Sequence, residues 1–338
     1  MTVRAAIIGC GHVAGGYDEA NPAKGCYTHA GAYRRCPEVE LVAAADPNPV
    51  RRAAFGRSWD VPHLYPEAAA LLRHHEVEIV SVCVPDALHE AVISEVLRTR
   101  PPKVIFAEKP LALTSQAASG LLRAASRSGG RLIVNNQRRW EPGHQRVRSL
   151  IRDGGIGDVV AVTALYVKGL YHLGCTVVDT IRFLVAEIRA VRVIGEAQEA
   201  SVPGDPSVDA VLYLEHGATA VMLGADRRGT RYFVFELDIL GTTGRVRITD
   251  NGGRITVFRV HGDPHDPDAA DLREAVAEAI PSDMGAAIPN GVRQIVRFAA
   301  GAGGCLDSDA EEAYRDLCVL DAIAASRARH GARVEVTG

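Results

Sequence analysis

The 338-residue chain lacks the marks of several large classes of protein. Its net charge of −3 and isoelectric point near 6.5 provide no basic surface, so nucleic-acid binding is not expected. No apolar run reaches the roughly 18 residues of a bilayer-spanning helix, and no signal-peptide core precedes the first apolar stretch. We expect a cytoplasmic protein without membrane contact.

Cysteine is present but follows no pattern. No C-x-x-C pair occurs and the total of 7 is odd, so neither a zinc site nor a disulfide framework is indicated. The segment "HGDPHDPDAADLRE" at residues 261–274 holds two histidines and several aspartates. Its prolines favour a solvated loop before a helix over a metal site. No metal is expected, and a reducing compartment fits best.

Length and apolar content predict two domains. A single hydrophobic core seldom serves more than about 250 to 300 residues, and 47% of this chain is hydrophobic. The sequence pattern changes near residue 134. We therefore expect a first domain at residues 1–134 and a second at residues 135–338, whose C-terminal helix can pack back on the first.

The first part of the chain alternates buried strands with amphipathic helices. The stretches "EVEIVSVCVPD", "KVIFAE" and "RLIVNN" are typical of buried strands, and "ALHEAVISEVLRTR" and "TSQAASGLLRAASRSGG" of helices. This β-α-β succession predicts an α/β Rossmann domain with a doubly wound parallel sheet.

The second part alternates apolar and polar residues over residues 159–262, as in "VVAVTALYV" and "YFVFELDIL". With His-Gly, Thr-Gly and Asn-Gly turns between the runs, this predicts an α+β domain with a large, mostly antiparallel open sheet. A helix around residues 177–187 would cover one face. Further helices are expected near residues 270–280, 290–301 and 308–329. The open face is a candidate surface for a homodimer or homotetramer, although sheets with one solvated face are equally ordinary.

The opening strand runs into a glycine-rich turn. In "VRAAIIGCGHVAGG", Gly9, Gly11 and Ala14 match G-x-G-x-x-G/A, in which the glycines make a tight turn and let backbone approach a diphosphate. Diphosphate oxygens would lie on the N–H groups of the helix start, at His12 and Val13. A dinucleotide cofactor is predicted.

The second strand, "VELVAAADPNP", ends on Asp46. A carboxylate there accepts hydrogen bonds from the adenosine ribose hydroxyls and repels a 2′-phosphate, so NAD is favoured over NADP. Arg51 and Arg52 weaken that preference, although both also fit a solvated first helical turn. Asp46 lies further from Gly9 than the usual spacing of about 20 residues.

The extra length lies in a polar, glycine- and proline-rich stretch within "GGYDEANPAKGCYTHAG". It reads as a loop inserted at residues 15–29 in the first crossover. Two interpretations are equally open. The loop is a tolerated surface insertion, or it is a lid that carries Tyr17, Tyr27 or His29 towards a substrate.

Lys109 follows a buried strand in "PKVIFAEKPLALT". Ligands in open α/β sheets bind outside the carboxyl ends of the strands, so this lysine is positioned for chemistry on a bound ligand. A lysine that only extends from the strand end to water is the alternative.

These motifs together resemble the Gfo/Idh/MocA oxidoreductases, the glucose-fructose oxidoreductase and inositol dehydrogenase family. The resemblance rests on "GCGHVAGG", Asp46, "VCVPDALH", "AEKP", "NNQRRWEP" and "HLGCTVVDTIRFL", which stand in the family's order over nearly the whole chain. It implies a nicotinamide-dependent enzyme acting on sugars, sugar nucleotides or cyclitols.

The resemblance also implies roles for residues around the cofactor. Lys109, beside Glu108, resembles the lysine that contacts the nicotinamide ribose and the reacting oxygen. Burial near a positive nicotinamide disfavours its charged form, which suits proton transfer. Pro85 and His89 resemble a turn against the cofactor, although His89 also fits an ordinary helix surface. Arg139, followed by Trp140, resembles an Arg-aromatic pair that joins the domains and is as readily structural as functional.

The second half of the site departs from the family pattern. Where members often carry Asp-x-x-x-His-x-x-Asp, this chain has His172, Thr176 and Asp179. We predict that His172 relays the hydroxyl proton, alone or with Lys109, because histidine titrates near neutrality. Thr176, on the same helix face, would only form hydrogen bonds. In the alternative, His172 is a packed helix-start residue and Lys109 acts alone. The predicted substrate-binding residues are Lys109, Lys168, Tyr171, His172 and Asp179.

The expected function is an NAD-dependent dehydrogenase that interconverts a ring hydroxyl and ketone of a sugar, aminosugar, aminoglycoside or cyclitol. Acidic residues in the loops suggest a cationic aminosugar. Two other functions stay open. One is a glycosidase that uses bound NAD to oxidise a sugar transiently, and the other is a non-catalytic NAD-binding sensor, which the presence of Lys109 disfavours.

Overall fold

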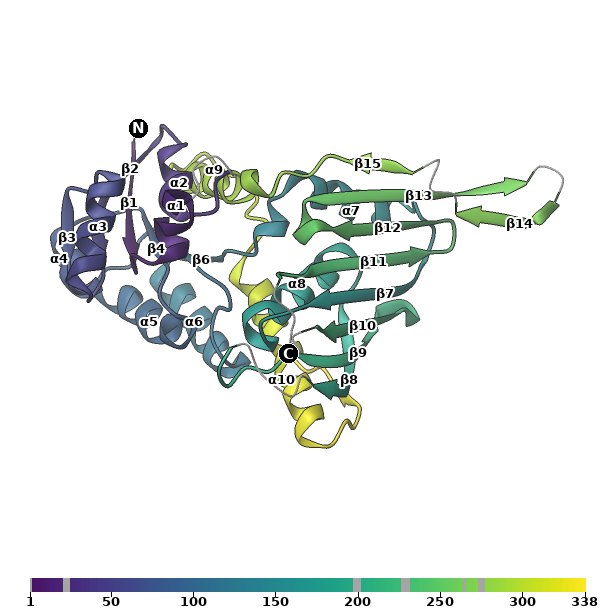
Figure 1. Ribbon diagram of the computed structural model, residues 1–338. Helices are drawn as coiled ribbons and strands as arrows, with labels where there is room; N and C mark the ends of the chain where they lie inside the picture. Colours follow the sequence, from purple (N-terminus) through teal and green to yellow (C-terminus); the bar gives the residue numbers. More distant parts are fainter. Residues whose placement is uncertain (1, 21–24, 197–201, 226–231, 264–265, 273–276) are drawn as a thin grey trace. The chain divides into compact units, whose positions relative to one another are not determined.

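The computed structural model describes residues 2–20, 25–196, 202–225, 232–263, 266–272 and 277–338. The chain forms two compact units, one of residues 1–140 with 284–317 and one of residues 141–283 with 318–338. Each unit is built on its own sheet (Figure 1). No helix in the described part of the chain has both the length and the hydropathy to cross a membrane.

The first unit contains a six-stranded parallel sheet in the order β3-β2-β1-β4-β5-β6. Every residue of β4 and β5 is buried, as expected for a parallel sheet with helices on both faces. The predicted doubly wound sheet is confirmed. Its strands are β1 (Val3–Ile8), β2 (Val39–Ala45), β3 (His63–Tyr65), β4 (Ile79–Val82), β5 (Val104–Ala107) and β6 (Arg131–Val134).

The strand order reverses direction at β1, so the first crossovers and the later ones cover opposite faces of this sheet. Trp140 packs edge-on against Phe106 in the core of the unit. The helices of the unit are η1 (His12–Gly16), α1 (Tyr17–Ala20), α2 (His29–Arg34), α3 (Pro49–Trp59), α4 (Ala68–His74), η3 (Asp86–Leu88), α5 (His89–Thr99), α6 (Ser115–Ser128), η4 (Gln137–Arg139), η9 (Met284–Ala286) and α9 (Ala287–Ala299).

The second unit contains a ten-stranded sheet in the order β14-β13-β12-β11-β7-β10-β9-β8-β16, with β15 paired to β13. Its pairs are antiparallel except for β10 with β7, which confirms the predicted mostly antiparallel sheet. Its strands are β7 (Val159–Tyr166), β8 (Ile188–Glu196), β9 (Val208–Leu214), β10 (Thr219–Gly224), β11 (Phe235–Gly241), β12 (Gly244–Thr249), β13 (Arg254–Asp263), β14 (Asp266–Leu272), β15 (Glu278–Ile280) and β16 (Val334–Glu335).

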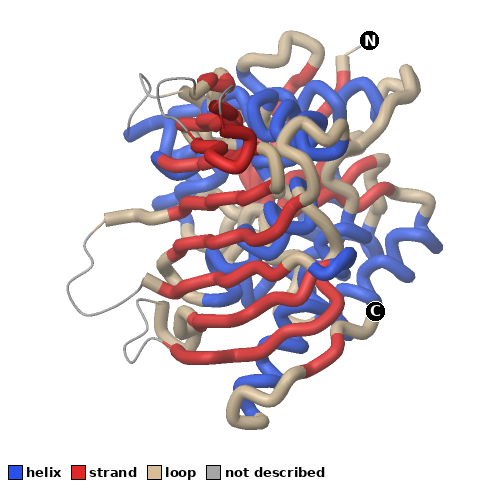
Figure 2. Tube along the Cα trace, turned by 90° about the vertical axis from the view of Figure 1, so that its right-hand side faces the viewer, coloured by secondary structure: helices blue, strands red, loops and turns tan. Residues whose placement is uncertain are grey.

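Helices cover one face of this second sheet. Within the unit, α7 (Pro142–Arg152) and α8 (Cys175–Leu184) lie behind the strands, and the other face carries no helix among the described residues (Figure 2). Every residue of α8 is buried, which fits the predicted covering helix. The remaining helical segments are η5 (Leu170–Gly174), η6 (Glu215–Gly217), η7 (Asp250–Gly252) and α10 (Ala310–Ala328), which begins in the first unit's residues and ends in the second's.

Two expectations about this region were wrong. The helix expected near residues 270–280 is replaced by the end of β14 and by β15, with residues 273–276 outside the described part. Pairing with β13, including Ile255 opposite Ile280, provides backbone partners that a local pattern does not reveal. The described residues of 261–274 therefore lie in two paired antiparallel strands rather than in a loop before a helix. The helices expected near 290–301 and 308–329 are confirmed as α9 and α10.

A buried carboxylate, that of Glu141, caps the N-terminus of α7. Glu141 and His144 are both 0% exposed, and one Glu141 oxygen accepts hydrogen bonds from the His144 N–H at 2.7 Å and its ring Nδ1 at 2.6 Å. The other oxygen accepts from the Asp283 N–H at 2.9 Å. Desolvation raises the pKa of Glu141, but these hydrogen bonds, one from the Gly143 N–H and the charge of His144 outweigh it and lower the pKa to about 2.

The ionised Glu141 should therefore stabilise the fold above pH 4.5, its ordinary pKa, and this contribution should disappear as the pH falls towards about 2. We expect Glu141→Gln to lower the free energy of unfolding at pH 7 by about 3 kcal/mol. The deficit relative to wild type should shrink between pH 5 and pH 3, in thermal denaturation followed by circular dichroism. Glu335→Gln, at an exposed ion pair, is the control. A deficit that stays constant with pH would contradict this assignment.

Candidate active site

The glycine-rich turn has the geometry of a diphosphate cradle. Gly9 has φ +89°, and a Cβ there would lie 2.6 Å from the Cys83 carbonyl oxygen, so only glycine fits between β1 and β4. A Cβ at Gly11 would meet nothing within 4 Å, so its backbone is open to a ligand. His12 and Val13 begin η1 directly behind it. The residues of this turn fit a dinucleotide.

Asp46, at the end of β2, is 3% exposed and faces this turn. One carboxylate oxygen accepts from the Cys10 N–H at 2.9 Å, and the other from the Asn48 N–H at 2.8 Å. The Arg51 guanidinium lies 3.5 Å from Asp46, and Arg52 donates to the Asp46 carbonyl oxygen at 2.5 Å. Asp46 thus places a carboxylate beside the glycine-rich turn, with the exposed guanidinium of Arg51 close to it.

Replacing this charge should change cofactor choice. Asp46→Asn keeps the side-chain shape but removes the repulsion of a 2′-phosphate and leaves Arg51 to pair with it. We expect the ratio of kcat/KM with NAD to that with NADP to fall by about tenfold. Initial rates of reduction of both cofactors measure this ratio. Asp60→Asn, an exposed aspartate of the same unit, should leave the ratio unchanged; an equal change there would refute the role of Asp46.

The inserted stretch packs into the first unit. Asp18 is buried and accepts hydrogen bonds from the Thr28 hydroxyl at 2.6 Å and the Tyr27 N–H at 2.8 Å, and Thr28 caps α2. His29 is 0% exposed, so the prediction that a lid carries it towards a substrate is wrong. Tyr17 is 56% exposed and stacks on His12. Residues 21–24 lie outside the described part.

Lys109 follows β5, at the carboxyl end of the sheet, and its side chain is partly exposed. The preceding Glu108 is only 7% exposed; His29 Nε2 lies 2.9 Å from its carboxylate and Asn135 donates to it at 2.5 Å. Burial raises the pKa of Glu108, but the hydrogen bonds from His29 and Asn135 and nearby positive charge, including that of Lys109, together lower it. A buried carboxylate that remains ionised therefore lies beside the candidate catalytic lysine.

His89 and Arg139 have structural partners in this unit. His89 is 0% exposed, with Nδ1 at 2.6 Å from the Pro110 carbonyl and Nε2 at 2.9 Å from that of Val84. The helix-surface interpretation is wrong, because the ring is buried and contacts the turn after β5, while the contact of His89 with the cofactor stays a prediction. Arg139 is 4% exposed and pairs with Glu312 at 3.0 Å, which supports the structural interpretation. Pro85 is exposed at the start of η3 and remains a predicted contact.

In the second unit, a tight turn presents the predicted substrate residues. Lys168 has φ +65° and Gly169 has φ +85°, and the Asp205 carboxylate accepts from the N–H groups of Tyr171 and His172 at 2.9 to 3.1 Å. A Cβ at Gly169 would lie 2.3 Å from Asp205. Asp205, which no sequence motif indicated, therefore holds the backbone that carries His172.

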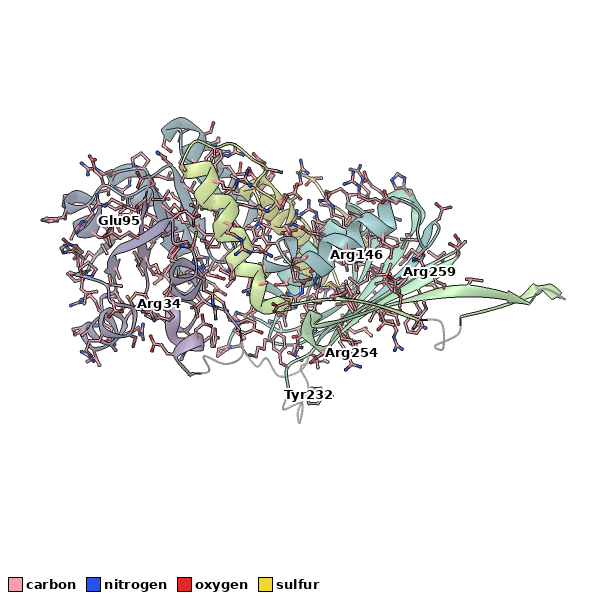
Figure 3. The ribbon with its side chains drawn as sticks, turned by 90° about the horizontal axis from the view of Figure 1, so that it is seen from above. Arg34, Glu95, Arg146, Tyr232, Arg254 and Arg259 are labelled. Atoms are coloured by element: carbon pink, nitrogen blue, oxygen red, sulfur yellow. The ribbon has the colours of Figure 1, made fainter. Side chains whose placement is uncertain are left out.

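The predicted residues of this unit differ in access. Lys168 is exposed, with its ammonium 5.3 Å from the centre of the Phe233 ring, and His172 is partly exposed. Thr176 is 7% and Asp179 1% exposed, so α8 buries both of them. The neighbouring Tyr232 is 73% exposed and stands out from the surface (Figure 3). Access to substrate thus favours Lys168, Tyr171 and His172 over Asp179.

Among the described residues, no group of three or more His, Cys, Asp or Glu side chains is placed to hold a metal ion. Sequence reasoning missed Ser81 and Asn135 near Glu108 in the first unit, and Asp205 beside His172 in the second. Asn135 had a usable signal, because it follows the predicted strand "RLIVNN" at the same sheet edge as Glu108.

Comparison with known proteins identifies the family. Residues 3–136 match the GFO_IDH_MocA family, described as "Oxidoreductase family, NAD-binding Rossmann fold". The NAD-binding part of the chain, residues 3–136, belongs to the Gfo/Idh/MocA oxidoreductases. The predicted family, the NAD-binding fold and the oxidoreductase class are thereby confirmed.

Relatives of the chain include a D-apiose dehydrogenase of Paraburkholderia graminis, 25% identical over 73% of this chain and 67% of the relative. An inositol 2-dehydrogenase of Rhizobium meliloti is 27% identical over 73% of this chain and 75% of the relative. Among solved structures, a levoglucosan dehydrogenase in complex with NADH and levoglucosan has a TM-score of 0.82 at 18% identity, with 100% of both chains covered. At that identity, the likeness shows the fold alone.

Proposed function

We propose that this protein is an NAD-dependent dehydrogenase that interconverts a ring hydroxyl and a ketone of a sugar, aminosugar or cyclitol. The observation that carries the proposal is Lys109, at the strand edge of the unit that also holds the diphosphate turn at Gly9 and Gly11. Relatives named as dehydrogenases of apiose and inositol support the substrate class.

In this proposed reaction, each residue of the site has a separate role. Bound NAD would accept the hydride from the carbinol carbon. Lys109 holds the reacting oxygen and takes or returns its proton, while Glu108 supplies a fixed negative charge beside it. In the second unit, Lys168 and Tyr171 bind substrate hydroxyls, and His172 relays the proton to solvent.

The test is a screen of NADH formation at 340 nm with neutral sugars, aminosugars, aminoglycosides, sugar nucleotides and inositols. Sustained NADH formation with one class supports the proposal. Glycosidic cleavage without net NADH would instead indicate the redox-type glycosidase. NAD binding without turnover of any compound would indicate a sensor and overturn the proposal.

We also propose that the uncovered face of the second sheet joins copies of the chain in a homodimer or homotetramer. Val211 and Val221 are direct cross-strand partners on β9 and β10, and Leu240 on β11 is 40% exposed. Side chains alternate between the two faces along each strand, so these apolar side chains lie on the face opposite to the buried residues of the same strands.

A charge on this face should prevent assembly. We expect Val221→Arg to reduce the mass measured by light scattering after size-exclusion chromatography to that of the 36.1 kDa monomer. Val50→Arg, at a 77% exposed valine of α3, should leave the mass unchanged. A wild-type protein that is already monomeric would refute this proposal.

A further inference from the structure

A chain of buried hydrogen bonds leads to the candidate catalytic lysine. The Tyr33 hydroxyl lies 2.6 Å from the Ser81 hydroxyl, and Ser81 Oγ lies 2.8 Å from His29 Nδ1. The other ring nitrogen of His29 lies 2.9 Å from Glu108 Oε1. Tyr33, His29 and Ser81 are at most 2% exposed, so water does not replace these partners.

The hydrogen bonds of this series can all be donated in one direction, from Tyr33 towards Glu108. Burial raises the pKa of Tyr33, so its hydroxyl stays protonated and donates to Ser81. Ser81 then donates to Nδ1 of His29, and His29 donates from Nε2 to the Glu108 carboxylate. Each buried donor has a partner in this arrangement only when His29 is neutral and carries its proton on Nε2. A doubly protonated His29 would leave the Ser81 hydroxyl proton without an acceptor.

The charge of Glu108 then needs a different counter-ion. A neutral His29 and the Asn135 amide donate hydrogen bonds to the carboxylate but add no positive charge. The positive charge of Lys109 contributes to the lowered pKa of Glu108, and the negative charge of Glu108 contributes to the raised pKa of the buried Cys83 thiol.

We propose that His29 is a positioning residue, fixed by Ser81 and Tyr33 as the neutral Nε2–H tautomer, and that it holds Glu108 as the ionised counter-charge of Lys109. His29 reaches this position because Asp18 and Thr28 anchor the inserted segment at the start of α2. The centroid of the Phe106 ring lies 4.3 Å from that of the His29 ring, so the two rings pack against each other. The catalytic part of the inference rests on the proposed function.

The first test does not need turnover. Full-length protein labelled with ¹⁵N-histidine is examined by long-range ¹H–¹⁵N correlation, and the His29 signals are assigned by their loss in His29→Gln. We expect the neutral Nε2–H pattern in wild type and a change of tautomer or protonation in Ser81→Ala. A doubly protonated or Nδ1–H His29 in wild type would overturn the proposal, as would an unchanged pattern in Ser81→Ala.

The second test compares two substitutions that differ in one donor. His29→Gln keeps an amide donor near the Nε2 position, whereas His29→Leu removes it. With the substrate found by the screen, we expect kcat to fall by about 10- to 100-fold in His29→Leu and to stay within a few-fold in His29→Gln. The KM for NAD should change little in either variant. His75→Gln, at a buried histidine bonded to Tyr65 in the same unit, is the control for folding.

Glu108→Gln completes the test. Without the carboxylate charge, the protonated lysine loses its counter-ion, so the acidic limb of the kcat/KM profile for oxidation should move by about one pH unit to lower pH. Equal losses in His29→Gln and His29→Leu, or an unmoved limb in Glu108→Gln, would show a merely structural role. If no compound is turned over, the proposed function fails and the tautomer measurement still decides the placement of His29.

Discussion

Lys109→Met should lower kcat by about 10²- to 10⁴-fold and leave NAD binding within a few-fold of wild type. Methionine matches the length of the lysine stem but can neither hold nor move a proton at the reacting oxygen. The diphosphate turn and Asp46 lie on other strands, at the ends of β1 and β2, so cofactor affinity should survive. Turnover is followed at 340 nm, and NAD binding by quenching of intrinsic fluorescence.

Lys103→Met is the matched control, because this exposed lysine of the same unit precedes β5 and donates to the Ala299 carbonyl oxygen at 2.8 Å. It should retain wild-type kcat. If Lys109→Met keeps more than a tenth of wild-type kcat, Lys109 is not the main proton-transfer group. A parallel loss of NAD binding would instead point to a role in holding the cofactor.

His172→Ala should lower kcat by about 10²-fold if His172 relays the proton. The substitution keeps the local backbone, because Asp205 accepts a hydrogen bond from the backbone N–H of residue 172. His172→Gln keeps hydrogen bonding without proton transfer, so it should be as slow as His172→Ala. Rates are measured from pH 6 to pH 10 with the substrate found by the screen.

The control for His172 is His74→Ala, an exposed histidine whose ring contacts the Ala70 carbonyl oxygen. It should behave as wild type. Turnover of His172→Ala within a few-fold of wild type would refute the relay and leave Lys109 to act alone. Recovery of activity in His172→Gln alone would show that hydrogen bonding, rather than proton transfer, is the contribution of this residue.

Local pattern was sufficient for much of the fold. Apolar periodicity and the glycine fingerprint predicted the parallel sheet, because each strand of such a sheet is buried on both faces and reads as a continuous apolar run. Alternating apolar and polar residues predicted the second sheet, because successive side chains of a strand point to opposite faces and only one face of such a sheet is buried. The expected helix at 270–280 was wrong because the pairing of β15 with β13 depends on a strand some 25 positions earlier.

The site was predicted only in part. Residues that directly follow a strand or a turn, such as Gly9, Asp46 and Lys109, could be found because their position in the sequence already places them at the binding edge of the sheet. His29 was judged wrongly, because the polarity of the inserted stretch suggested a surface loop. Asp18 and Thr28 instead anchor the segment and turn His29 inward.

By itself, the sequence determined the fold of both units, the dinucleotide site and the position of Lys109, because strand ends, glycines and hydrophobic periodicity are local properties. Only the tertiary structure decided what surrounds that lysine. His29, Ser81, Glu108 and Asn135 come from four separate segments and meet in a buried network. Their partners are set by packing across the sheet, and no spacing along the chain encodes such contacts.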